Sequence, residues 1–158
     1  SEMCIRDRCK KAYCKAFGDW NYSVEESFIE HSEYTILGGY EAMKRLLQRI
    51  PDIDGIICCN DQVASGALHA LKEFGGENAD RVAIVGFGGV AMSIITTPSI
   101  TTMIAPRYEI GYKAAEILLN RINGNAEPPQ KMILSSHMAI RSSTLRSSFK
   151  NLAAMFEE

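Results

Sequence analysis

The chain has 158 residues, of which 46% are hydrophobic and 23% charged, and its formal net charge is −2. This composition is typical of a globular domain, and the near-neutral charge gives no electrostatic footprint for nucleic acid. No apolar run approaches the roughly 20 residues that a membrane span needs, and no secretory signal is visible. We therefore expect a cytoplasmic protein with no membrane partner.

The N-terminal part predicts one helix followed by an irregular stretch. Residues 9–17 predict part of a helix with its apolar side chains on one side. Residues 1–8, SEMCIRDR, fit poorly with this segment and resemble a translated cloning or sequencing scar, so we leave them out of the fold prediction. Residues 18–38 read as irregular, with one short strand around residues 27–29.

Helix and strand then alternate. Apolar spacing predicts a helix over residues 40–50 that Pro51 ends, a buried strand over 53–59, a helix capped by Asn60 or Asp61, and a strand over 82–85. This order predicts an α/β fold with an open, doubly wound parallel sheet. Ligands of such sheets bind beyond the carboxyl ends of the strands, where Asn60 and the run Gly86-Phe87-Gly88-Gly89 fall.

The last third of the chain predicts three further elements. These are a strand over residues 100–104, a long helix that opens at Pro106 and ends at Asn123-Gly124, and a strand over 131–140. The tail, residues 145–158, reads equally well as a short helix or as a frayed end.

The glycine run raises the question of a dinucleotide site, because Gly86, Gly88 and Ala91 have the spacing G-x-G-x-x-A after a strand. The context argues against that site, since only about six residues separate the run from Thr96-Thr97-Pro98 and several of them are poor helix formers. Two interpretations remain: a tight turn that uses glycine where φ is positive, or the mouth of a small-molecule site.

The sequence contains no motif typical of a metal site or of an enzyme active site. The five cysteines and three histidines match no common metal-ligand spacing, and we expect free structural thiols at Cys58 and Cys59. No nucleophile and base, paired carboxylates or cofactor motif stands out, so we predict no catalytic residue, no cofactor and no enzyme.

Five segments in a fixed order resemble the effector-binding part of LacI-type bacterial transcription regulators. They are GYEAM, IDGIICCNDQVASGAL, RVAIVGFGGV, TPSITTMIAPRYEIGYKAAEILLNRI and IRSST. The resemblance implies a two-lobed, periplasmic-binding-protein-like fold in which a sugar binds between the lobes. It also implies a homodimer that contacts operator DNA only through an N-terminal helix-turn-helix, which is absent from this sequence.

The resemblance implies a division of the chain. Residues 9–99 would form most of the C-terminal lobe, truncated at its N-terminus, and residues 100–130 a crossover strand and helix of the N-terminal lobe. Residues 131–144 would return to the C-terminal lobe. A central strand would precede Cys9, and its absence would leave backbone and apolar faces exposed. We therefore expect this chain to be poorly soluble or partly unfolded alone.

The resemblance also assigns site residues. Asn60 stands where relatives contact the sugar, although an asparagine there also serves as a helix cap. Tyr34 stands where an aromatic ring stacks on the effector, although a loop tyrosine that covers the core is an equal alternative. Asp61 fits a cap and scaffold role better than a ligand role.

The glycine run departs from the family pattern. Most relatives have an Asp that bridges sugar hydroxyls where this chain has Gly88, which Gly89 follows. Loss of that carboxylate suits an anionic ligand, exposed backbone N–H groups would cradle its oxygens, and Arg107 would meet it if it is not simply a solvent-exposed residue. The Gly-Phe-Gly-Gly form is similar to regulators that sense sucrose, trehalose or their phosphates. We expect a sugar or sugar-phosphate effector. The alternative is the sugar-binding protein of a transporter.

Overall fold

The computed structural model describes residues 2–76, 79–124, 128 and 131–145, with side chains from residue 8 onward. Its elements follow the predicted alternation of helix and strand. In chain order they are α1 (Glu2–Asp19), the 3₁₀ helix η1 (Glu26–Phe28), α2 (Ile36–Arg49), β1 (Gly55–Ile57), α3 (Asp61–Phe74), β2 (Ala83–Gly88), α4 (Met92–Ile95), β3 (Thr101–Ile104), α5 (Arg107–Ile122) and β4 (His137–Ala139).

The four strands form one sheet in the order β1-β2-β3-β4. The first three are parallel, with Ile57 opposite Val85 and Gly88 opposite Ile104, and β4 is antiparallel to β3. The carboxyl ends of β1 and β2 therefore meet at one edge, as the sequence predicts for a ligand-binding sheet.

The core lies between α2, α3 and the strands. Its largest fully buried apolar side chains are Met43, Leu71, Ile84, Ile100 and Val82. Gly39 and Gly66 let α2 and α3 approach backbone to backbone, because a Cβ on either would lie under 3.0 Å from main-chain atoms of the other helix. This close crossing brings the N-terminal ends of the two helices together.

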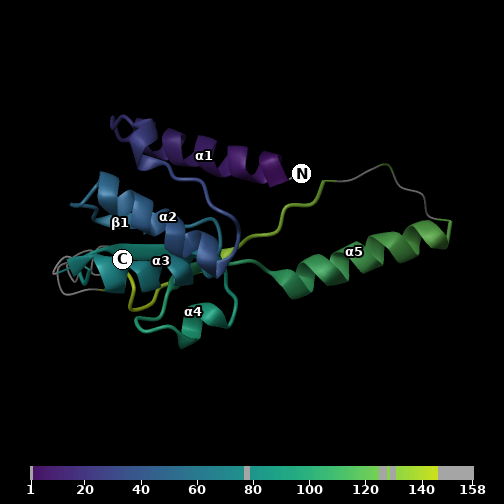
Figure 1. Cartoon of the computed structure of the whole chain (residues 1–158). Coiled ribbons are helices and arrows are strands. Elements are labelled where there is room, and N and C mark those ends of the chain that lie inside the picture. The colour runs from purple at the N-terminus through teal and green to yellow at the C-terminus, as the bar shows by residue number, and fades with distance from the viewer. Residues whose placement is uncertain (1, 77–78, 125–127, 129–130, 146–158) are drawn as a thin grey trace, which may run out of the picture.

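Two helices lie outside this core. Figure 1 shows α1 on the outer side of α2 and α5 projecting away from the body. No residue of α5 is buried. The ion pair between Lys10 and Glu26, at 2.6 Å, connects α1 to η1.

Residues 2–8 form the first turns of α1, and their origin as a scar stays a prediction. One expectation for the N-terminal part differs from the structure. The strand expected around residues 27–29 is wrong, because Phe28 and Ile29 donate to the carbonyls of Glu25 and Glu26 and form the 3₁₀ turn η1 instead. These local bonds replace the sheet partner that a strand would need. The tail from residue 146 onward lies outside the described residues.

Strand β3 extends the sheet beyond residue 100, because it pairs with β2 from Val85 opposite Thr101 onward. The sheet therefore continues through Ile104, and the chain leaves the body at α5. The division of the chain into lobes at residue 100 stays a prediction.

The C-terminal segment joins β2 to β3 where their direct pairing begins. The Ser143 hydroxyl donates to the Ile84 carbonyl at 2.6 Å and accepts from the Thr101 N–H at 2.8 Å. Its backbone accepts from Ile84 and donates to Ser99. Part of the IRSST motif thus completes the sheet.

Candidate functional site

Side-chain caps hold the N-terminal ends of α2 and α3. Thr35 Oγ1 accepts from the Gly38 N–H at 3.0 Å, and Asn60 Oδ1 accepts from the Val63 N–H at 2.7 Å, so the predicted cap of α3 is confirmed. Asn60 Nδ2 donates to the Tyr34 carbonyl at 3.5 Å. An amide nitrogen carries two N–H donors, so the bond to Tyr34 uses one and leaves the other for a ligand.

The glycine run ends β2 and turns sharply. The strand continues through Gly88, and Gly88 and Gly89 have φ of 124° and 68°, in the region that favours glycine. The following helix, α4, has only four residues, so no helix is present that could receive a pyrophosphate in the manner of a dinucleotide site. The predicted turn with positive φ is confirmed.

Asp61, the first residue of α3, connects the turn to the N-terminal end of that helix. Its side chain is 1% exposed. Asp61 Oδ2 accepts from the Val90 N–H at 2.8 Å, and Asp61 Oδ1 accepts from the Thr102 hydroxyl at 2.5 Å. The same Thr102 oxygen accepts from the Gly89 N–H at 3.3 Å. The scaffold role expected for Asp61 fits this geometry, whereas the cap of α3 is Asn60.

The turn is therefore not an open cradle of N–H groups. We expected exposed N–H groups to bind anions, but those of Gly89 and Val90 already donate to Thr102 and Asp61. Glycine still leaves the edge free of side chains at positions 88 and 89.

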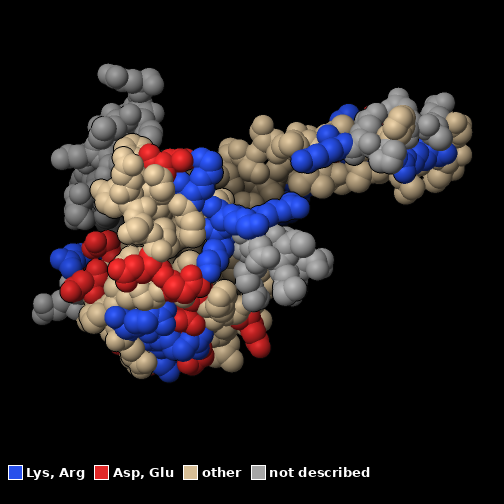
Figure 2. Space-filling model, turned by 90° about the horizontal axis from the view of Figure 1, so that it is seen from above, with Lys and Arg blue, Asp and Glu red and all other residues tan. Residues whose placement is uncertain are grey.

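Arg107 lies beside the turn. It is exposed, is the first residue of α5, and donates from Nη2 to the Gly88 carbonyl. A guanidinium has five N–H donors, so this bond leaves others for a ligand. Figure 2 shows lysine and arginine side chains gathered where α5 joins the body. Arg107 therefore places a positive charge beside the turn.

Tyr34 lies on the other side of Asn60. It lines a shallow, open hollow of about 730 Å³ along the start of α2. The lining residues are His31, Ser32, Glu33, Tyr34, Leu37, Gly38, Glu41 and Arg45.

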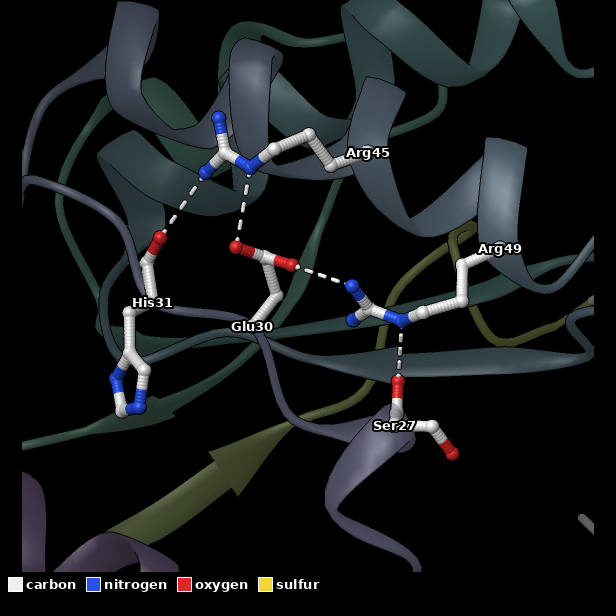
Figure 3. A network of polar contacts seen from close by, with 5 residues as sticks. All are labelled: Ser27, Glu30, His31, Arg45 and Arg49. Carbon is white, nitrogen blue, oxygen red and sulfur yellow. Dashed lines mark hydrogen bonds and ion pairs between the residues drawn. The ribbon is translucent and has the colours of Figure 1, made fainter.

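A polar network fixes the segment that leads to Tyr34, as Figure 3 shows. Glu30 accepts from Arg45 Nε at 3.1 Å and from Arg49 Nη1 at 3.0 Å, and the two arginines also donate to the carbonyls of His31 and Ser27. Burial raises the pKa of Glu30, but the hydrogen bonds and charges of the two arginines outweigh it, so the net pKa is lower than usual.

The five predicted site residues therefore form two groups. Asn60 contacts Tyr34, and Arg107 contacts Gly88, with Gly89 next to it. Asp61 lies between the groups, because it follows Asn60 in the chain and its Oδ2 is 3.6 Å from where a Cβ on Gly88 would be. The hollow beside Tyr34 includes none of the other four residues.

The supporting residues Thr102 and Ser93 were not anticipated from the sequence. Each is 0% exposed and hydrogen-bonded at the turn. The one available signal was a polar side chain inside a segment that otherwise reads as buried.

Two classes of site find no support in the described part of the chain. Within residues 8–76, 79–124 and 131–145, no three His, Cys, Asp or Glu side chains are grouped as metal ligands. Over the same residues, no helix is long and apolar enough to cross a membrane.

Burial raises the pKa of the Cys58 thiol to about 12, with smaller contributions from Cys59 and Asp61, so this thiol stays protonated.

Comparison with known proteins identifies relatives along most of the chain. Residues 2–144 match the model of a family described as periplasmic binding protein-like domain. The chain is 29% identical over 119 residues to the HTH-type transcriptional regulator CelR of Thermobifida fusca, covering 75% of this chain and 35% of CelR. It is 31% identical over 122 residues to the HTH-type transcriptional regulator MalR of Streptomyces coelicolor, covering 77% of this chain and 35% of MalR.

The solved structures agree with this result. A complex of the transcriptional regulator CelR with cellobiose superposes with a TM-score of 0.78 at 27% identity, covering 83% of this chain and 40% of that one. The chain spans about a third of the length of the curated relatives named above.

Proposed function

Because the chain belongs to the periplasmic binding protein-like family, in the form that LacI-type transcription regulators carry, we propose that it senses a sugar for such a regulator. The family match over residues 2–144 carries this proposal. The regulator would act in the cytoplasm as a homodimer and repress genes of carbohydrate uptake or catabolism. A helix-turn-helix outside this sequence would bind the operator.

The effector would bind at the carboxyl edge of the sheet. Asn60 would contact sugar hydroxyls through its remaining amide N–H, because its oxygen already caps α3. Tyr34 would pack its ring against the sugar. Gly88 and Gly89 would form a floor without side chains, and Arg107 would close the site from the start of α5.

A sugar or sugar phosphate, with a disaccharide as the leading candidate, fits this arrangement. The structure of the relative CelR contains cellobiose. In this chain Gly88 supplies no carboxylate, and Arg107 supplies positive charge beside it. An arginine with free donors pairs well with phosphate, so a phosphorylated sugar is the more specific form of the proposal.

The transporter alternative is the weaker proposal. The two curated relatives named above, CelR and MalR, are both named as transcriptional regulators, which favours the regulator.

Asn60→Asp provides the sharpest test of the site. Aspartate keeps the acceptor that caps α3 but removes the amide donors, including the long bond of 3.5 Å to the Tyr34 carbonyl. We therefore expect a small loss of stability and a loss of sugar binding. Calorimetry would titrate a panel of free and phosphorylated disaccharides, cellobiose included, into the longer protein that carries this chain. We expect binding of at least one sugar and a loss of about tenfold or more in affinity in the variant. Negligible heat from every sugar would contradict the proposal.

Arg107→Gln separates the two effector classes. If the effector carries a phosphate, the variant should weaken binding of the phosphorylated sugar and leave its unphosphorylated form unaffected. Equal effects on both forms would assign Arg107 a role unrelated to the anionic group.

A further inference from the structure

Three buried side chains from three elements hold the turn at Gly88–Val90. Asp61 of α3 accepts from the Val90 N–H, Thr102 of β3 accepts from the Gly89 N–H, and Ser93 of α4 donates to the Val90 carbonyl at 2.7 Å. Side chains therefore satisfy two N–H groups and one carbonyl of the turn, at Gly89 and Val90.

Thr102 holds a central place in this arrangement because its hydroxyl is used twice. It donates to Asp61 Oδ1 at 2.5 Å and accepts from the Gly89 N–H at 3.3 Å. Asp61 is a buried carboxylate, and a buried carboxylate is costly unless hydrogen bonds compensate for lost water. Without the Thr102 hydroxyl, Asp61 Oδ1 would lose this donor and the Gly89 N–H would lose its acceptor.

We propose that Thr102 is a positioning residue for the effector site: it sets the conformation of the Gly88–Val90 turn through Asp61 and Gly89, without touching the effector. Thr102 is 0% exposed, so it offers a ligand no surface. Both residues that it holds belong to the proposed site or adjoin it, since Asp61 follows Asn60 and Gly89 forms the proposed floor together with Gly88. Its effect on effector affinity rests on the proposed function, whereas its effect on the turn does not.

The adjacent Thr101 is a matched control. It is 1% exposed, lies on the same strand, and also has a bonded hydroxyl. Its hydroxyl accepts from the Arg141 N–H at 2.8 Å, donates to the Arg141 carbonyl at 3.1 Å and lies 2.6 Å from Thr144 Oγ1. None of these bonds ends on a residue of the turn; the Arg141 guanidinium donates to Ser93, but that bond does not involve Thr101.

Amide hydrogen exchange in the purified protein tests the proposal directly. Thr102→Val keeps the shape and removes the hydroxyl, so exchange at Gly89 and Val90 should accelerate by about tenfold or more, while the amides of Ile56 and Ile84 keep their rates. Thr101→Val should leave Gly89 and Val90 unchanged. Thr102→Ser retains a hydroxyl and should restore slow exchange at both residues.

Cellobiose titration of the same variants adds the functional readout. We expect Thr102→Val to lower affinity by about tenfold, with Thr101→Val and Thr102→Ser close to the parent protein. Equal exchange rates at Gly89 and Val90 in the two valine variants, or acceleration that serine fails to rescue, would overturn the proposal. If the parent protein takes up no cellobiose, the exchange result alone decides the role of Thr102, and the calorimetric panel separately decides the proposed function.

Discussion

Asp61 lies directly against Gly86, so closely that a Cβ on Gly86 would lie under 3.0 Å from Asp61 Oδ1. Gly86 is in the interior of β2 and Asp61 is the first residue of α3. The contact explains why glycine occupies a strand position where a side chain would normally pack. Glycine at position 86 leaves room for the buried Asp61 carboxylate, whereas Gly88 and Gly89 allow the positive φ angles of the turn.

Gly86→Ala should therefore destabilise the fold. The added methyl group would displace Asp61 from its two donors, and we expect a loss of about 2–4 kcal/mol in the free energy of unfolding. Gly55→Ala is the control, because its Cβ would meet no atom closer than the Ala83 carbonyl oxygen at 3.7 Å. Urea denaturation of both variants checks this expectation, and equal stability of the two would contradict it.

Ser143→Ala should weaken the junction between β2 and β3. The substitution leaves the Ile84 carbonyl without this donor and the Thr101 N–H without this acceptor, both in a buried place. We expect a loss of about 1–3 kcal/mol by thermal or chemical denaturation. Ser142→Ala should change stability by less than about 0.5 kcal/mol, because Ser142 is exposed and its hydroxyl bond to Ser99 is long, at 3.4 Å. A larger effect at Ser142 than at Ser143 would refute this role.

The elements that the sequence predicts well are those with local signals. The cap at Asn60, the end of α3 at Gly75 and the apolar run of β2 each depend on residues close together in the chain. Strand β1 forms as predicted but is not buried, because Gly55 and Ile57 are exposed at the edge of the sheet. The edge at which Asn60 and Gly88 fall follows from parallel pairing alone.

The sequence failed where distant residues decide the structure. Local bonds close the 3₁₀ turn η1 at Glu26–Phe28, and Arg49 in α2 adds a donor to the Ser27 carbonyl from 22 positions away, which the local pattern does not show. The bonds of Thr102 to Asp61 span 41 positions and have no periodicity to reveal them. The same contacts occupy the N–H groups of Gly89 and Val90. Because these contacts are not visible in the local sequence, the sequence alone could not show that the turn is not an open anion site.

The ion pairs of Glu30 should make stability depend on pH. Its folded-state pKa lies below the ordinary carboxyl value of 4.5, so its contribution is present above pH 4.5 and is lost as the pH falls through the lowered pKa. Thermal midpoints of the parent protein and Glu30→Gln should therefore differ at neutral pH and converge in acid. Glu26→Gln is the control, because Glu26 pairs with Lys10 at an exposed site where ion pairs contribute little. A parent-to-variant difference for Glu30 that persists unchanged in acid would contradict this assignment.

Cys58 and Cys59 should differ sharply in reactivity although they are neighbours. Cys58 is buried with a pKa of about 12, whereas Cys59 is exposed. The thiolate is the reactive form, so iodoacetamide should modify Cys59 in the folded protein and spare Cys58 until the protein unfolds. Peptide mass spectrometry with and without urea reads both sites. Equal labelling of the two thiols in the folded protein would show that β1 opens to solvent.

Helix α5 should be the least protected helix of the chain when the chain is studied alone. None of its residues is buried, and it exposes Tyr108, Ile110, Tyr112, Leu118, Leu119 and Ile122. A 16-residue helix without tertiary packing is marginal in water, so its amides should exchange within about tenfold of unstructured rates, whereas those of α3 exchange far more slowly. The same exposed side chains should promote self-association, as we expect for the chain as a whole. Monomeric material in which α5 and α3 are equally protected and unfold in one sharp transition would contradict both expectations. In that outcome α5 must pack against the body in a way that its exposed side chains do not indicate.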